Sequence, residues 1–389
     1  MARRAVGTVT RSMFCLSRSR SQQATEGHTD GLATPNCARS VPVGCAVPAI
    51  VRNERTAIMK ILVTGGSGFV GEHLLRRLAA DGHTVLALAR SSTSGKKVRA
   101  LGATPLPGDL DRPDEFALPA LDAVVHAAAY FRFAGSRAAY FRSNVAGTRA
   151  LLNAAKHAGA TTFVYMSAAG VVMDGRGSPM HAVNESAKTY PKSSSGYIAT
   201  KSISEAEVLA ANTMRFRTIA LRPSAIWGPG DSFSREIPGR IETGRFAFIN
   251  RGDYPFSTCH VDNVAEAVQL ALGGGPGGHA YFVNDREPIT FRQFIASLAD
   301  VQGFSIDKLR SVPYPAAVSL GWFMETIASL RSDQTDPPLT RTMVRMIGRE
   351  FTTDDRAARA ELGYVGQTSR ADGLKQLRAA RWRGNSAPQ

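Results

Sequence analysis

Short apolar runs alternate with segments of helical periodicity along the chain from residue 59 onwards. Val70, Leu74 and Leu78 fall one helical turn apart, which predicts a helix with one buried stripe. The pattern predicts parallel strands at 61–63, 84–89, 102–110, 121–129, 162–167 and 218–222, and further helices at about 143–158 and 197–214. Such alternation favours an α/β fold in which a doubly wound parallel sheet binds its ligands beyond the carboxyl ends of the strands.

A glycine-rich turn joins the first predicted strand to the first helix, in the stretch T-G-G-S-G-F-V-G. One glycine permits the tight turn, one lets the backbone approach a pyrophosphate, and one lets the helix pack closely on the strand. The helix N-terminus offers free N–H groups and the positive end of its dipole to that pyrophosphate. The sequence therefore predicts a Rossmann-type dinucleotide site, rather than a plain glycine-rich connection. Its predicted contact residues are Thr64, Gly65, Gly68, Phe69, Val70 and Gly71.

Arg90 stands at the end of the strand that follows this helix. An acidic residue at this place hydrogen-bonds the ribose of NAD, whereas an arginine accommodates the 2′-phosphate of NADP. Arg90 therefore favours NADP as the cofactor, with NAD as the alternative if this arginine is an ordinary solvated strand end.

The pattern divides the chain into three parts. Residues 1–58 show no helical or strand periodicity, and we interpret them as a disordered leader or an extension of the gene model, with a targeting role as the alternative. Residues 59–236 carry the alternation and form the predicted dinucleotide-binding domain, to which 258–272 return. The alternation loosens afterwards, so 237–380 are expected to form a smaller, mixed, substrate-binding lobe.

Charge and cysteine content narrow the classes of function. The formal charge of +15 falls to +10 without the eight arginines and three acidic residues of the leader, and the remaining charges are dispersed. No nucleic-acid partner is indicated, because no nucleic-acid motif accompanies these charges, and an anionic cofactor or a membrane surface explains them equally well. Cys259 is the single cysteine outside the leader, so we expect no metal site and a reducing, cytoplasmic location, with no transmembrane span.

A second set of chemically active residues lies in S-G-Y-I-A-T-K, at the start of a predicted helix. Tyr197 and Lys201 are four residues apart and so share one face of that helix. We expect the Lys201 ammonium, about 5 Å away, to lower the pKa of the Tyr197 phenol by about two units from its ordinary value near 10. Tyr197 could then exchange a proton with a substrate hydroxyl or carbonyl while a hydride moves to or from the cofactor.

The order of the motifs from Thr64 to Ala265 resembles the extended short-chain dehydrogenase/reductases of the epimerase/dehydratase branch. Beside the two motifs above, these are G-D-L, H-A-A-A, N-V-A-G-T, L-R-P-S-A-I-W-G-P-G-D and H-V-D-N-V-A. The later stretches Y-F-V-N-D-R-E-P-I-T-F-R-Q-F and F-T-T-D-D-R-A-A-R-A-E-L-G-Y are similar to 3β-hydroxysteroid and sterol-4-carboxylate dehydrogenases. The resemblance implies further cofactor contacts at Asp109, Leu110, Ala127, Ala128, Ala129, Tyr197, Lys201 and Pro223.

The residues after the fifth predicted strand depart from the pattern of this family. Relatives usually carry two hydroxyl residues there, and the second hydrogen-bonds the substrate oxygen, but this chain has Ser167 and Ala168. The resemblance implies Ser167 as a third catalytic residue, offset by one position, beside Tyr197 and Lys201. The alternative is that Ser167 only satisfies polar groups at the end of the strand.

Four other polar residues have structural explanations. His126 lies in an apolar strand and is interpreted as a satisfied core residue or a residue at the cofactor edge, rather than a base. Asn144 resembles the structural asparagine of the family, and His260 and Asp262 resemble positions that tie the two lobes together.

The resemblance implies an NAD(P)-dependent oxidoreductase that interconverts a secondary alcohol and a ketone on an apolar, steroid-, triterpenoid- or flavonol-like substrate, in a homodimer. Tyr130, Phe131 and Phe133 follow the fourth predicted strand and could line the substrate pocket. A nucleotide-sugar epimerase or dehydratase is the alternative, but 222–224 and 258–259 lack the Phe-Asn and the arginine with which those enzymes grip a sugar nucleotide. A non-catalytic dinucleotide-binding protein, the third alternative, would generally have lost the Tyr–Lys pair.

Overall fold

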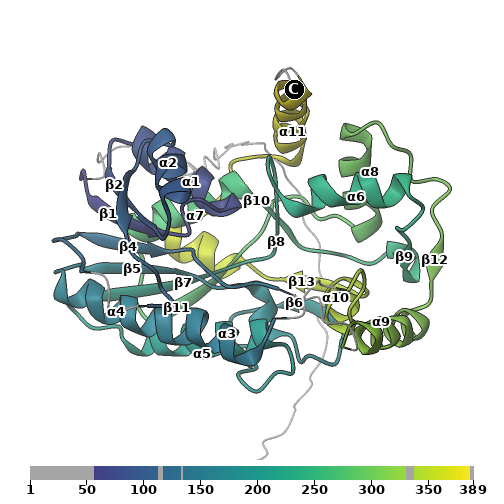
Figure 1. Ribbon diagram of the computed structural model, residues 1–389, viewed down its shortest axis with the longest axis horizontal. Helices are drawn as coiled ribbons and strands as arrows, with labels where there is room; N and C mark the ends of the chain where they lie inside the picture. The colour runs from purple at the N-terminus through teal and green to yellow at the C-terminus, as the bar shows by residue number, and fades with distance from the viewer. Residues whose placement is uncertain (1–56, 113–116, 133–134, 330–336, 386–389) are drawn as a thin grey trace, which may run out of the picture. The chain divides into compact units, whose positions relative to one another are not determined.

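A seven-stranded sheet forms the centre of the protein, in the spatial order β11-β7-β5-β4-β1-β2-β3 (Figure 1). The computed structural model describes residues 57–112, 117–132, 135–329 and 337–385. Every neighbouring pair of strands in this sheet is parallel. The strands are β1 (Lys60–Thr64), β2 (Thr84–Ala89), β3 (Thr104–Pro107), β4 (Ala123–His126), β5 (Thr162–Met166), β7 (Arg217–Pro223) and β11 (His279–Val283).

Helices cover both faces of the sheet because alternate strand residues point in opposite directions. Ile61 and Val63 pack in one core with α1 (Phe69–Ala80), α2 (Ser92–Ala100) and α7 (Val261–Gly273). Leu62, which lies between them, packs in another core with α4 (Gly147–His157) and α5 (Gly196–Ala210). The prediction of a doubly wound, Rossmann-type α/β fold is therefore confirmed.

Two predicted strands are shorter in the structure. β3 is confined to an edge of the sheet, where Pro105 and Pro107 have no N–H to donate to a ladder. β4 ends at His126, and the Ala128 N–H then donates to the Thr64 hydroxyl at 3.2 Å instead of to a neighbouring strand. Strand prediction therefore failed where the chain turns into the loops above the sheet.

The helix predicted at 143–158 is composite in the structure. A short α3 (Arg137–Tyr140) leads into a π-helix, η2 (Phe141–Ala146), and α4 follows without a break. Single π-turns of this kind occur often at functional sites. α5 is also shorter than predicted and ends at Ala210.

A second group of elements packs around an aromatic core that contains Trp227, Phe248, Phe256, Phe291 and Phe294. Short parallel pairs and helices build it, to the right of the sheet in Figure 1. The pairs are β6 (Met180–Val183) with β13 (Phe351–Thr353), β8 (Ala225–Trp227) with β10 (Thr258–His260), and β9 (Phe248–Ile249) with β12 (Ser311–Val312). The helices are α6 (Ser232–Glu242), α8 (Phe291–Val301), α9 (Tyr314–Ser329), α10 (Arg341–Ile347) and α11 (Arg370–Asn385), with single turns at η3 (Ala169–Val172), η4 (Asn250–Gly252) and η5 (Ala358–Leu362).

The chain beyond residue 237 contributes to both groups of elements. α7 and β11 belong to the central sheet, and Leu362 and Tyr364 pack into the core beneath it. Met180 and Phe351, which come from β6 and β13, pack instead into the aromatic core. The two cores are therefore built from interleaved stretches of sequence.

Two predictions cannot be followed in the structure. Residues 1–56 of the predicted leader lie outside the described residues, as does Phe133. Within the described ranges, no helix has both the length and the apolar character needed to cross a membrane.

Candidate active site

The glycine turn after β1 is shaped by close backbone contacts. Gly65 has a φ of +74°, and a Cβ built on it would lie 2.7 Å from the Ala128 backbone N. A Cβ on Gly71 would lie 2.0 Å from the Gly65 carbonyl oxygen, so α1 could not approach the turn with any larger residue there. Gly68 is less confined, since its Cβ would meet the same oxygen at 3.3 Å. The fold therefore requires glycine at positions 65 and 71. Gly68 places no side chain over the exposed side of the turn, so a ligand can approach the backbone there.

The first turn of α1 has free N–H groups above this loop. Gly68 occupies the N-cap position, and no side chain caps the helix there. Phe69, Val70 and Gly71 open the helix with their backbone N–H groups at its positive end. A bare, backbone-lined helix start of this kind fits an anionic phosphate group.

The other predicted cofactor residues lie at the carboxyl ends of parallel strands. Arg90 directly follows β2, Asp109 and Leu110 follow β3, and Pro223 ends β7. Ala127, Ala128 and Ala129 follow β4, which neighbours β1 where the order of the sheet changes direction. This junction is the place at which a doubly wound sheet binds its ligand.

Arg90 is exposed, and within the described ranges it forms no hydrogen bond or ion pair. Ser91 caps α2 by accepting the Ser94 backbone N–H at 3.2 Å. Lys97 from the same helix reaches the glycine loop, where its ammonium donates to the Ser67 carbonyl at 2.8 Å and pairs with Glu72. Sequence reasoning missed Lys97, because nothing in its spacing links it to the loop.

His126 lies at the centre of a buried chain of polar groups. Its Nδ1 lies 2.6 Å from the Thr64 hydroxyl and its Nε2 lies 2.8 Å from the Thr148 hydroxyl. Burial, reinforced by the charge of Lys201, lowers the pKa of His126 to about 3. The interpretation of His126 as a satisfied core residue is confirmed.

Asn144 joins the loop after β4 to α5. Its side-chain oxygen accepts the Tyr130 N–H at 2.7 Å, and its amide nitrogen donates to the Tyr130 carbonyl and to the Thr200 hydroxyl, each at 3.1 Å. The π-helix η2 places Asn144 for these contacts, and Thr200 stands one residue before Lys201. The structural interpretation of Asn144 is therefore confirmed.

Tyr197 and Lys201 occupy the first two turns of α5, which Ser195 caps through the Ile198 N–H. The Lys201 ammonium is buried, donates to the Met166 carbonyl at the end of β5, and lies 4.1 Å from the centre of the Tyr165 ring. The Tyr197 ring contacts Phe131 edge to face, with 4.8 Å between centroids. Lys201 is thus held by the strand end, and Tyr197 is held beside the aromatic loop.

The ionisation of this pair differs from the prediction. Burial, with the neighbouring Tyr140, raises the pKa of Tyr197 to about 12, whereas we expected Lys201 to lower it. Burial also lowers the pKa of Lys201 to about 7, against a smaller opposing effect of Glu205. The predicted decrease rested on the positive charges of Lys201 and of a bound nicotinamide, whereas desolvation is the largest influence on the Tyr197 pKa in the polypeptide itself.

Ser167 belongs to a buried polar cluster that the sequence did not reveal. Its hydroxyl donates to Glu205 Oε2 at 2.6 Å. Arg222 binds the same carboxylate at two points, from Nε at 3.0 Å and from Nη2 at 2.6 Å. All three side chains are almost fully buried. The hydroxyl proton of Ser167 is therefore engaged by Glu205, one turn beyond Lys201 on α5.

His260 and Asp262 connect segments that are far apart in the chain. Asp262 contacts His73 of α1 at 3.1 Å and Gln376 of α11 at 3.0 Å. The backbone N–H of His260 donates to Asp285 at 2.6 Å, and its Nδ1 accepts the Asp262 N–H. The predicted role of both residues as connections is confirmed.

Asp285, which sequence reasoning missed, is the centre of this network. Besides His260, the side chains of Trp227, Thr258 and Asn263 donate to its carboxylate. The signal available in the sequence was its position just after a strand, within Y-F-V-N-D-R. No spacing indicated how many donors would converge on it.

Comparison with known proteins places this geometry in a family. Residues 62–314 match the 3-beta hydroxysteroid dehydrogenase/isomerase family. The chain belongs to that family. It is thus an NAD(P)-dependent oxidoreductase of the extended short-chain type that acts on a CH–OH group, and the resemblance stated from the motifs is confirmed.

Individual relatives support the same placement. The chain is 38% identical to a 4-hydroxy-2-methyl-3-oxo-4-farnesyl-3,4-dihydroquinoline-1-oxide ketoreductase of Stigmatella aurantiaca, over 83% of this chain and 96% of that one. It is 34% identical to a 2-alkyl-3-oxoalkanoate reductase of Stenotrophomonas maltophilia, over 83% and 99% respectively. Among solved structures, that of gox2253 superposes with a TM-score of 0.67 at 25% identity and covers 85% of this chain and 99% of that one. A UDP-glucose 4-epimerase from Thermotoga maritima, at 20% identity and a TM-score of 0.66 over 84% of this chain and 100% of that one, shares the fold.

Proposed function

We propose that this protein is an NADPH-dependent ketone reductase in which Tyr197 gives the proton and Lys201 supports it. The observation that carries this proposal is the fixed position of the pair. α5 sets the two side chains one turn apart, and the Met166 carbonyl at the end of β5 holds the Lys201 ammonium. Both residues come from α5. The end of β5 that holds Lys201 lies at the carboxyl edge of the parallel sheet, as does the glycine turn after β1.

The residues around that turn fit a dinucleotide. The confined backbone of Gly65 and Gly71, the bare Gly68 and the uncapped start of α1 offer N–H groups to a pyrophosphate. When bound, the dinucleotide supplies the hydride. The chain itself would hold the pyrophosphate of the dinucleotide on backbone N–H groups. It would also supply the proton, from Tyr197.

Arg90 supports NADP over NAD, because its guanidinium is exposed at the end of β2 and has no partner within the described residues. The variant Arg90→Asp should lose about 10- to 100-fold in kcat/KM with NADPH, since a charge-assisted hydrogen bond to phosphate contributes about 1.5–3 kcal/mol. The matched control is Arg99→Asp, which reverses a charge at the far end of α2. Unchanged selectivity in Arg90→Asp would remove the basis for NADP.

The names of the relatives support reduction as the direction. With a pKa of about 12, the Tyr197 phenol holds a proton at neutral pH that it can donate to a substrate carbonyl oxygen. Two of the relatives are named as a ketoreductase and a reductase.

The substrate is proposed to be apolar. Phe131 is 47% exposed beside the Tyr197 ring, which leaves an aromatic surface next to the proton donor. The relatives named above act on a farnesylated quinoline and on 2-alkyl-3-oxoalkanoates, which carry apolar chains. The solved epimerases and dehydratases support the fold alone, at 16–24% identity, so the sugar-nucleotide alternative is not favoured.

A substrate panel tests the proposal. We would follow NADPH absorbance with hydroxysteroid ketones, flavanonols, alkyl β-keto esters and nucleotide sugars. An apolar ketone should be reduced, and Tyr197→Phe should lower its turnover by about 10²–10⁴-fold with NADPH affinity kept, because a general acid contributes about that much. The control is Tyr190→Phe, which removes a tyrosine hydroxyl outside α5. Turnover of sugar nucleotides alone would overturn the proposal.

A homodimer is also proposed, formed through the face of η2 and α5. Phe141 is 48% exposed on η2 and lines a mostly apolar groove with Ala199 and Ile203 of α5. A second copy of this face would cover these side chains. Sedimentation of the wild type as a dimer and of Phe141→Glu as a monomer would support it, whereas a wild-type monomer would contradict it. A cytoplasmic location stays a prediction from the sequence.

A further inference from the structure

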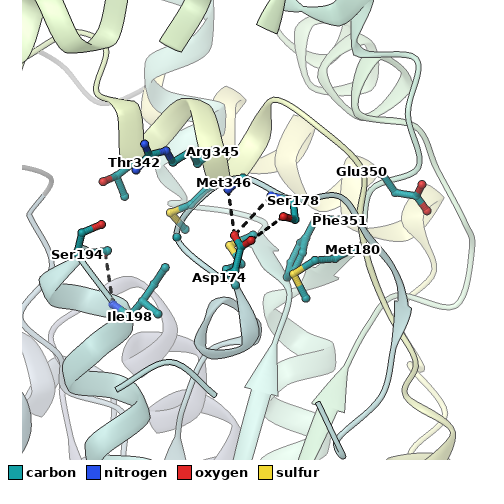
Figure 2. A pocket seen from close by; sticks show the side chains of 14 residues that line it. Asp174, Ser178, Met180, Ser194, Ile198, Thr342, Arg345, Met346, Glu350 and Phe351 are labelled. Atoms are coloured by element: carbon teal, nitrogen blue, oxygen red, sulfur yellow. Dashed lines mark hydrogen bonds between the residues drawn. The ribbon is translucent and has the colours of Figure 1, made fainter. Parts of the chain in front are cut away.

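A pocket opens beside the first turn of α5, and its wall combines methionines with polar side chains (Figure 2). Met173, Met180 and Met346 line it together with Ile198 and Phe351. Ile198 directly follows Tyr197, so the pocket and the proposed proton donor share the first turn of α5. The free volume of the pocket is about 20 Å³, so an alkyl chain would enter only as the flexible methionine side chains move apart.

The carboxylates that line this pocket are already engaged by neighbours. Asp174 accepts the Gly177 N–H at 3.0 Å and the Ser178 hydroxyl at 2.6 Å, and Figure 2 shows it turned into these contacts. Burial alone would raise the pKa of Asp174, but the hydrogen bonds leave it below its ordinary value. Glu350 pairs with the exposed His181 at 2.6 Å. The acidic groups of the pocket therefore have partners of their own.

Arg345 is different, because this guanidinium on α10 lines the pocket without a partner. It forms no hydrogen bond or ion pair to any residue that the structure describes, and its Nε is buried. The hydroxyl of Tyr314, at the start of α9, is also buried without a partner. Both side chains meet at Gly177, where an added Cβ would lie 1.9 Å from the Tyr314 hydroxyl oxygen and 3.1 Å from Arg345 Cγ.

Two buried polar atoms without a partner, Arg345 Nε and the Tyr314 hydroxyl, lie beside a pocket of mixed polar and apolar lining and indicate a missing acceptor. Buried polar groups are normally hydrogen-bonded, and leaving them unpaired destabilises the fold. A planar guanidinium matches a carboxylate in geometry and charge, and a tyrosine hydroxyl can add a further hydrogen bond. The methionines that line the same pocket would contact an apolar chain.

We propose that Arg345, assisted by Tyr314, binds a carboxylate on the substrate, so that the substrate class is an alkyl keto acid rather than a neutral ketone. This inference rests on the proposed ketone reduction at Tyr197. The carboxylate lies at α10, the alkyl chain lies along the methionines, and the keto group lies toward α5. Arg345 is a binding residue here and takes no part in proton transfer.

The test compares 2-methyl-3-oxodecanoate with its methyl ester, which has the same skeleton and lacks the charge. Wild-type enzyme with NADPH should have a lower KM for the acid than for the ester. Arg345→Met should raise the KM for the acid about 10- to 100-fold, as expected for the loss of a charge-assisted hydrogen bond, and leave kcat and the KM for the ester unchanged. Arg345→Lys should restore part of the loss, and Tyr314→Phe should raise the KM for the acid by less than Arg345→Met does.

The control is Arg341→Met, one turn earlier on α10, because Arg341 is bound to Glu325 at 2.6 Å and does not line the pocket. It should leave the KM for both compounds unchanged. Equal KM values for acid and ester in the wild type, unaffected by Arg345→Met, would overturn the inference and leave ketone reduction standing. If neither compound is reduced, the proposed function fails. Calorimetric titration with 3-hydroxydecanoate then tests whether Arg345 binds a carboxylate. Binding that is lost in Arg345→Met would then support it, and absence of binding would overturn it.

Discussion

The glycine turn and the β5–α5 junction border the same edge of the sheet, but they are built in different ways. The turn is made by backbone atoms, with Gly65 and Gly71 too confined for a Cβ. The junction is made by side chains that meet across long stretches of sequence, as Ser167 meets Glu205 and Arg222. The turn leaves no room for a side chain at Gly65 or Gly71, whereas the junction depends on side-chain partners supplied by other elements.

This difference decides how the two regions should respond to mutation. A backbone site fails when an atom is added, because nothing nearby can move away. A side-chain network fails when an atom is removed, because the remaining members are left buried without partners.

Gly71→Ala should prevent folding of the dinucleotide region. Its Cβ would lie 2.0 Å from the Gly65 carbonyl oxygen, which is far inside van der Waals contact. Gly68→Ala is the matched control, since its Cβ would meet the same oxygen at 3.3 Å. Circular dichroism and NADPH fluorescence should find Gly71→Ala unfolded and Gly68→Ala folded but weakened in cofactor binding. A folded, NADPH-binding Gly71→Ala would show that the turn is less confined than its geometry indicates.

Glu205→Ala should destabilise the protein by about 3–5 kcal/mol, because it leaves Arg222 as an unpaired buried charge. Glu207→Ala on the same helix is the control, since its pair with Arg149 is partly exposed and should contribute no more than about 1 kcal/mol. Urea unfolding followed by tryptophan fluorescence measures both. Equal losses in the two variants would mean that the buried cluster adds nothing beyond a surface pair.

The rate of ketone reduction should depend on the charge of Lys201. The pKa of Lys201, lowered by burial to about 7, means that its ammonium is present below that pH and lost above it. Without the ammonium, the phenolate that forms when Tyr197 gives up its proton is less stable. kcat/KM for reduction should therefore fall above about pH 7, and Lys201→Arg, which keeps its charge, should remove that fall. A wild-type profile that is level from pH 6 to 9 would contradict this dependence.

The sequence predicted well those features that depend on local spacing. The glycine turn, the strand at 84–89 and the Tyr–Lys pair on α5 each follow from a few neighbouring residues. The shortened β4 and the π-turn at Asn144 could not be predicted, because contacts with Thr64, Tyr130 and Thr200 determine them. The same holds for the raised pKa of Tyr197, which reflects burial that no four-residue spacing reveals.

The residues that contact Ser167, and Arg345, show the limit of prediction from sequence more clearly. Arg222 was noted only as part of a motif, and Glu205 was not considered, although together they engage the Ser167 hydroxyl. Their polar character was visible, but their pairing depends on β5, β7 and α5 lying side by side. Arg345 is a similar case, because its lack of a partner is a property of the packed structure alone.

Ser167→Ala should have the smallest effect on turnover. Since Glu205 engages the Ser167 hydroxyl, we expect less than a tenfold loss in kcat and a loss of about 1 kcal/mol in stability, the usual contribution of one hydrogen bond. Ala168→Ser, which restores the hydroxyl found in relatives, is the comparison. A loss of ~10²-fold or more in Ser167→Ala at saturating NADPH would instead assign Ser167 the role of a substrate hydrogen-bond donor.

Transfer of a labelled hydride is the sharpest test of ketone reduction with Tyr197 as the proton donor. Reduction of an accepted ketone with NADPH deuterated at the transferred position should place one deuterium on the new carbinol carbon, detected by mass spectrometry. Tyr197→Phe should lower the rate of that transfer without changing where the label appears. Product that carries no deuterium, or a deuterated alcohol formed at the wild-type rate by Tyr197→Phe, would contradict the account.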